Sequence, residues 1–149
     1  MMQFKKTLMM LILSSSIGST EINMDTQAYI EEYKKHENVQ TTSTGIVYRL
    51  IEKGDGEVSP NPAQTVTVHY EGKLINGEVF DSSFKRGTPA KFGLNQVISG
   101  WTEGLQLMHV GDTMELVIPP ELAYGAQGIN GVIPGNSTLV FKVQLIDIQ

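Results

Sequence analysis

The sequence contains no cysteine, and this absence excludes several classes of protein. Disulfide-stapled folds, thiol nucleophiles, iron–sulfur clusters and cysteine zinc sites all require that residue. The histidines are only three, His36, His69 and His109, and their spacing does not place them on one element as metal ligands. The sequence therefore predicts a protein without a metal site.

Basic residues are also few. The chain has 11 lysines and arginines but 16 aspartates and glutamates, which gives a formal net charge of −5 at pH 7. A surface of this sign does not attract nucleic acid and attracts anionic lipid little. Common catalytic motifs are missing too. Ser82 and Ser83 lack the Gly-x-Ser-x-Gly elbow of a hydrolase, and Gly125, Gly128 and Gly131 lack the order of a dinucleotide-binding loop.

The first 18 residues have the pattern of an export signal. Lys5 and Lys6 make a positive start, residues 8–13 are uninterruptedly apolar, and residues 14–18 are mostly small. The apolar run is too short to span a bilayer. We predict cleavage after Gly18 and a periplasmic or secreted product without a membrane span. An amphipathic N-terminal helix that stays in the fold is the alternative.

The length of 149 residues favours one domain with short appendages. Residues 19–41 are predicted to form a short helix and a linker, with Asp25 capping a helix that runs to about Lys35 and a linker over residues 39–45. The compact domain is predicted over residues 42–149.

Alternating and β-branched segments predict strands at residues 46–51, 65–70, 114–118 and 139–148, and Asn76-Gly77 predicts a hairpin whose return strand includes Val79 and Phe80. Residues 97–108 are predicted to contain a helix, because Trp101, Leu105 and Met108 share a stripe at helical spacing. Residues 119–137 are predicted to be irregular. Four or more antiparallel strands with one helix favour an α+β domain whose sheet packs one face on that helix.

Five strings in the domain resemble, in the same order, the FKBP-type peptidyl-prolyl cis-trans isomerases. They are Val-His-Tyr-Glu-Gly at 68–72, Val-Phe-Asp-Ser-Ser at 79–83, Val-Ile-Ser-Gly-Trp-Thr-Glu-Gly-Leu at 97–105, Ile-Pro-Pro-Glu-Leu-Ala-Tyr-Gly at 118–125, and Ser-Thr-Leu-Val-Phe at 137–141. The resemblance implies the FKBP-like fold, in which a twisted antiparallel sheet wraps around one short central helix, here preceded by a short N-terminal helix.

Within this family the chain looks most like the exported bacterial branch of macrophage infectivity potentiator and FkpA-like proteins, through Thr-Thr-x-x-Gly at 41–45 among other features. Two departures from the branch carry expectations. Only residues 19–40 stand where those relatives have a long helical dimerisation region, which predicts a monomer. Ala90 stands where the human prototype has a large aromatic residue, which predicts a lower pocket wall.

The resemblance implies isomerisation of X-Pro bonds in exported proteins, which assists their folding in the cell envelope without a cofactor. The implied partners are proline-containing peptides, unfolded exported proteins and macrolide inhibitors of the FKBP class. Asp81, Tyr124 and Ile98 are the implied catalytic residues, Ile98 through its backbone N–H, and Arg86 and Tyr70 hold Asp81 in place. The implied substrate-binding residues are Tyr70, Phe80, Phe92, Val97, Ile98, Trp101 as the floor, Tyr124, Ile133 and Phe141.

Other interpretations of these residues remain open. Aromatic residues in a small domain more often build the core than a site, and Asp81 also suits the start of a turn. The groove of a non-catalytic peptide-binding or holdase chaperone domain would use the same residues. A structural or adhesion-type exported β domain would not require this set.

Overall fold

A computed structural model describes residues 17–149, with the side chains of the first helix described from Asp25 onward. The predicted export signal lies almost wholly outside the described residues. Within the described part of the chain, no helix combines the length and the apolar character needed to cross a membrane.

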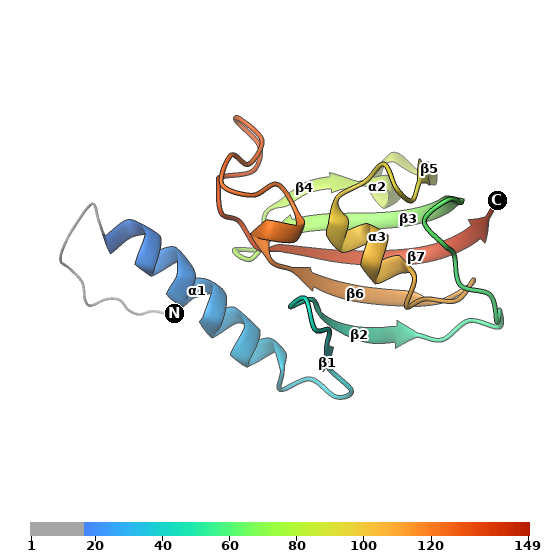
Figure 1. Ribbon diagram of the computed structural model, residues 1–149, viewed down its shortest axis with the longest axis horizontal. Coiled ribbons are helices and arrows are strands. Elements are labelled where there is room, and N and C mark those ends of the chain that lie inside the picture. Colours follow the sequence, from blue (N-terminus) through green and yellow to red (C-terminus); the bar gives the residue numbers. More distant parts are fainter. Residues whose placement is uncertain (1–16) are drawn as a thin grey trace.

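Seven antiparallel strands form a single sheet, which confirms the predicted α+β class (Figure 1). The order across the sheet is β1-β2-β6-β7-β3-β4, and β5 also pairs with β3. The strands are β1 (Gln40–Thr41), β2 (Val47–Glu52), β3 (Thr65–Leu74), β4 (Val79–Ser82), β5 (Ala90–Gly93), β6 (Thr113–Ile118) and β7 (Leu139–Ile148). β1 lies in the segment that composition predicts as a linker.

Two strands share one edge of β3, and this arrangement shapes the site. β4 pairs with residues 71–73 of β3, whereas β5 pairs with residues 65–68. The short helix α2 (Ser83–Arg86), absent from the sequence prediction, leaves the sheet between them. The opening that results lies beside Tyr70, whose side chain points inward because β3 alternates buried and half-buried residues along its length.

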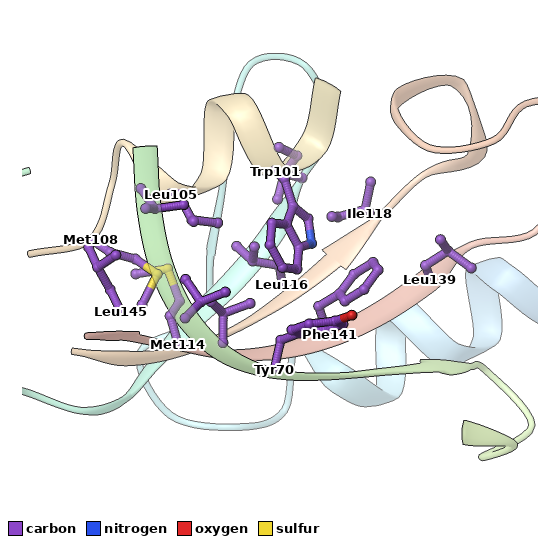
Figure 2. Packing of buried hydrophobic residues seen from close by; sticks show 14 of the residues in the cluster. Tyr70, Trp101, Leu105, Met108, Met114, Leu116, Ile118, Leu139, Phe141 and Leu145 are labelled. Atoms are coloured by element: carbon purple, nitrogen blue, oxygen red, sulfur yellow. The ribbon is translucent and has the colours of Figure 1, made fainter. Parts of the chain in front are cut away.

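The helix α3 (Ser99–Leu105) lies across the inner face of the sheet and is shorter than the predicted segment at 97–108 (Figure 1). Its glycines allow a close approach to β6, because a Cβ at Gly100 would lie 2.5 Å from Ile118 Cγ2 and one at Gly104 would lie 2.9 Å from Leu116 Cδ1. Figure 2 shows the main hydrophobic core between α3 and the sheet, with Trp101 pointing from the helix towards the strands.

The N-terminal helix α1 spans Ile17–Tyr33 and ends on the outer face of the sheet. Tyr33 packs there with Val47, Val117 and Val140 in a second, smaller core. The predicted short helix is present and ends close to the predicted Lys35, but its predicted start is wrong, because Asp25 lies inside the helix instead of capping it. The sequence between Gly18 and Tyr33 contains neither glycine nor proline, so the backbone hydrogen bonding continues beyond Asp25 towards the N-terminus.

Tyr33 also anchors α1 through a polar contact on this outer face. Its hydroxyl donates to Glu115 Oε1 over 3.0 Å, and Arg49 Nε donates to the same carboxylate oxygen over 3.2 Å. The Arg49 guanidinium lies 5.5 Å from the centre of the Tyr33 ring. Burial, followed by the negative charge of Glu115, raises the pKa of Tyr33, so this hydroxyl remains a donor at neutral pH.

Candidate active site

A pocket of about 480 Å³ opens between the start of α3, the inner face of the sheet and the loop that follows β6. Nine of the residues that line it are predicted site residues: Tyr70, Phe80, Asp81, Phe92, Val97, Ile98, Trp101, Tyr124 and Phe141. Residues that are far apart in the sequence therefore meet at one apolar cavity with a few polar groups, which is the usual composition of a small-ligand site.

Trp101 forms the floor of the pocket and is only 4% exposed. Three rings pack against it edge to face, with centroid distances of 5.3 Å to Tyr70, 5.5 Å to Phe92 and 5.4 Å to Phe141. Figure 2 shows the Tyr70 and Phe141 rings beside the indole. Its Nε1 atom is buried and has no hydrogen-bond partner among the described residues. The floor is thus held by ring geometry, and the aromatic residues serve both the core and the cavity.

One wall of the pocket consists of Phe80 and Phe141, whose ring centroids are 5.7 Å apart at nearly a right angle. Both rings lie over Gly72. A Cβ there would come within 2.6 Å of Phe141 Cε1 and 2.7 Å of Phe80 Cζ. The position of this wall therefore depends on the absence of a side chain in the middle of β3.

Among the residues that the structure describes, Asp81 is the one carboxylate in the pocket lining. Tyr70 Oη donates a hydrogen bond to Asp81 Oδ2, and Arg86 Nη1 lies 2.5 Å from Oδ1. Burial on its own would raise the pKa of Asp81, but the hydrogen bonds from Tyr70 and Arg86 outweigh it and lower the pKa below its ordinary value. The carboxylate is therefore ionised at neutral pH and fixed in direction.

Two hydrogen-bond donors at the pocket are available to a ligand. Ile98 stands at the start of α3, where its carbonyl accepts from the N–H groups of Trp101 and Thr102. No described residue accepts a hydrogen bond from the Ile98 N–H or from the Tyr124 hydroxyl. Burial, and then the charge of Asp81, raise the pKa of Tyr124, so its hydroxyl keeps its proton.

Two residues differ from the sequence-based expectation for the pocket. Ile133 does not line it. The backbone of the 119–138 segment turns back in a bridge between Ile129 and Ile133, and Ile133 packs into the main core and borders a second hollow instead. Gln96 lines the pocket although it was not predicted, and its position just before Val97 is the only sequence signal for it. Ala90 is not among the lining residues, and the lower wall expected there stays a prediction.

The three histidines lie at separate places in the fold. His36 packs on Tyr33, His69 stacks on Phe84, and His109 lies beside Asp112. Across residues described by the structure, no group of three or more histidine, aspartate or glutamate side chains could hold a metal ion.

Comparison with known proteins assigns a family to this arrangement. The profile of the FKBP-type peptidyl-prolyl cis-trans isomerases matches residues 56–146. FkpA of Escherichia coli K12 is 52% identical over 121 residues, covering 81% of this chain and 44% of the relative. Mip of Coxiella burnetii is 48% identical over 123 residues, covering 83% of this chain and 53% of the relative.

Solved structures agree with the sequence comparison. The crystal structure of E. coli FkpA matches with a TM-score of 0.83 at 46% identity, covering 90% of this chain and 62% of that one. A peptidyl-prolyl cis-trans isomerase from Pseudomonas syringae matches with a TM-score of 0.79 at 32% identity, covering 92% and 98% of the two chains. The chain spans about half the length of the curated relatives named here.

Proposed function

Because the chain belongs to the FKBP-type peptidyl-prolyl cis-trans isomerase family, we propose that it catalyses cis-trans isomerisation of X-Pro bonds in the pocket above Trp101. The observation that carries this proposal is the combination, in one apolar cavity, of an aromatic floor and an ionised carboxylate held by two donors. The proposed substrates are proline-containing segments of unfolded exported proteins.

The reaction needs no group to be transferred, because only rotation about the amide bond is required. That rotation is slow since the planar amide loses its resonance in the twisted state. An apolar pocket disfavours the polar planar amide relative to the less polar twisted form, and contacts made only to the twisted form lower the barrier further. The reaction therefore requires neither a metal nor a cofactor.

Each polar group in the pocket has a proposed role in this reaction. The Ile98 N–H and the Tyr124 hydroxyl donate to carbonyls of the substrate and hold the chain across the pocket. The Asp81 carboxylate faces the carbonyl that rotates out of the amide plane, and Tyr70 and Arg86 keep it in that direction. The proline ring packs on Trp101.

A comparison of Asp81→Ala with Trp101→Leu tests these roles. A protease-coupled assay on a proline peptide gives the isomerisation rate, and the affinity for a macrolide such as rapamycin and the thermal midpoint complete the comparison. Losing a contact that exists mainly in the transition state should slow Asp81→Ala by about tenfold to a hundredfold, with a smaller loss of affinity. Trp101→Leu should lose affinity through the missing floor. Full activity in a folded Asp81→Ala variant would show that Asp81 only starts a turn and takes no part in catalysis.

A non-catalytic holdase that uses the same groove is the alternative function, and the same assay separates the two. A holdase would bind proline peptides without changing the rate at which they isomerise. The ionised and hydrogen-bonded Asp81 supports catalysis, because a groove for unfolded chains has no need of a fixed carboxylate.

Periplasmic or secreted location and a monomeric state are also proposed. The export-signal pattern of residues 1–18 supports the location. The docking of Tyr33 on the outer face of the sheet supports the monomer, because it covers part of the apolar surface of α1 with the domain itself. Light scattering that gave twice the mass of the chain would contradict the monomer.

A further inference from the structure

The hydroxyl of Ser83, the first residue of α2, is attached to the backbone of β3. Ser83 is fully buried. Its Oγ accepts a hydrogen bond from the Tyr70 N–H over 2.7 Å and lies 3.3 Å from the Tyr70 carbonyl oxygen, to which it donates. His69 Nδ1 lies 2.8 Å from Ser83 Oγ. One side chain thus joins the start of the helix to two successive residues of the strand.

The helix that carries Ser83 is too short to define its own position. α2 has four residues, and an isolated helix of this length is not stable. Ser82, the last residue of β4, pairs with Glu71 of β3 and caps the helix by accepting from the Lys85 N–H, so it joins only the first turn of α2 to the sheet. Further attachment to β3 comes from Ser83 and from the stacking of Phe84 on His69, with ring centroids 4.8 Å apart.

The other end of α2 supplies a group that holds Asp81. Arg86 donates to the Asp81 carboxylate and, through Nη2, to Tyr70 Oη over 3.2 Å. The Arg86 guanidinium lies 5.7 Å from the centre of the Tyr70 ring. The position of the Arg86 guanidinium thus depends on the position of α2, and the position of the Tyr70 hydroxyl depends on the position of the β3 backbone. Ser83 bonds to both elements at once.

We propose that Ser83 is a positioning residue of the active site: its buried hydroxyl locks α2 to β3 and so fixes the two groups, Arg86 and Tyr70, that hold the Asp81 carboxylate. The inference rests on the proposed isomerase function. Ser83 does not act on substrate itself, although it lies beside a histidine as a hydrolase nucleophile would. Its oxygen is fully buried and already bonded to the backbone of β3.

A double-mutant cycle between Ser83→Ala and Arg86→Ala tests the proposal. If Ser83 acts through the hold on Asp81, Ser83→Ala should lower kcat/KM about fivefold to tenfold in the natural protein, the equivalent of one hydrogen bond. The fall should be in kcat, with KM changed less than twofold. In the Arg86→Ala background the further loss should be clearly smaller, about twofold, because only the hydrogen bond from Tyr70 to Asp81 then remains for Ser83 to position.

Thr138→Val is the matched control, since it also removes a buried hydroxyl, one that bonds to Thr26 and not to the site. Thr138→Val should change kcat/KM by the same factor in the natural protein and in the Arg86→Ala variant. Equal losses from Ser83→Ala in both backgrounds would overturn the proposal and leave Ser83 a structural residue. If Ser83→Ala does not fold, Ser83→Cys, which keeps the volume but bonds weakly, takes its place in the cycle.

A titration of the Asp81 carboxyl by carbon NMR separates this inference from the proposed function. In folded Ser83→Ala the pKa of Asp81 should rise towards its ordinary value, and in Thr138→Val it should not change. This result would support the role of Ser83 even if the natural protein did not isomerise proline peptides. An unchanged Asp81 pKa in Ser83→Ala would refute the positioning role even in a fully active enzyme.

Discussion

Gly72 lies in β3 beneath the Phe80 and Phe141 rings, which form one wall of the pocket. Replacing it with alanine would displace both rings. The new Cβ would be 2.6 Å from Phe141 Cε1 and 2.7 Å from Phe80 Cζ, whereas ordinary contacts begin at 3.4 Å. Each ring would have to withdraw by about 0.7 to 0.8 Å. Both rings line the pocket. Rings that withdraw from the new Cβ would therefore move into the space that a ligand would occupy.

Stability and activity should respond to Gly72→Ala to different extents. Overpacking a core costs about 1 to 3 kcal/mol, and replacing a strand glycine with alanine returns roughly 0.5 to 1 kcal/mol. The free energy of unfolding should therefore fall by about 0 to 2.5 kcal/mol. A shift of nearly 1 Å in the groups that position substrate can cost about a hundredfold in rate, so kcat/KM should fall far more than stability.

Gly104→Ala is the control for this experiment. Its Cβ would also be too close to a neighbour, 2.9 Å from Leu116 Cδ1, but that atom is the end of a flexible side chain outside the pocket lining. Alanine also favours the helix by about 1 kcal/mol. Unfolding by denaturant, isomerisation rate and macrolide affinity should stay near those of the natural protein. A folded Gly72→Ala variant with unchanged rate and affinity would refute the role assigned to this wall.

Three further predictions concern the charge of Asp81, metal ions and the docked helix. Since hydrogen bonds hold the pKa of Asp81 below its usual range, its contribution to stability should be present above about pH 4 and be lost as the pH falls through the lowered pKa. Arg86→Ala should move the acid limb of the kcat/KM profile to higher pH, and an unmoved limb would contradict the assignment. EDTA should leave the isomerisation rate unchanged, and loss of activity restored by zinc would contradict the mechanism. Tyr33→Phe should lower the free energy of unfolding by about 1 to 2 kcal/mol in denaturant titrations without changing the rate, and unchanged stability would contradict the anchoring of α1.

The parts of the fold with a strong local pattern could be predicted from the sequence. The alternation in residues 65–70 and 139–148 identified two central strands, because one face of each is buried against α3. β1 and β5 were missed because they have two and four residues, too few to show a period. α2 was missed for the same reason, and its place depends on contacts with β3 that are distant in sequence.

The site was predictable mainly through its resemblance to a family, because single aromatic residues do not distinguish a pocket from a core. The ring set around Trp101 in fact belongs to both. Ile133 lies in the main core and not among the residues that line the pocket, so its contact with substrate stays a prediction. The hold on Asp81 by Tyr70 and Arg86 was expected, whereas the role of Ser83 required the positions of α2 and β3.

The most direct test of the central claim is an NMR exchange measurement of the cis-trans rate of a proline peptide with the chain at catalytic concentration. The natural protein should raise the exchange rate without changing the cis-to-trans ratio, and folded Asp81→Ala should raise it about tenfold to a hundredfold less. A folded natural protein that binds the peptide but leaves its exchange rate unchanged would contradict the claim that this pocket is an isomerase site.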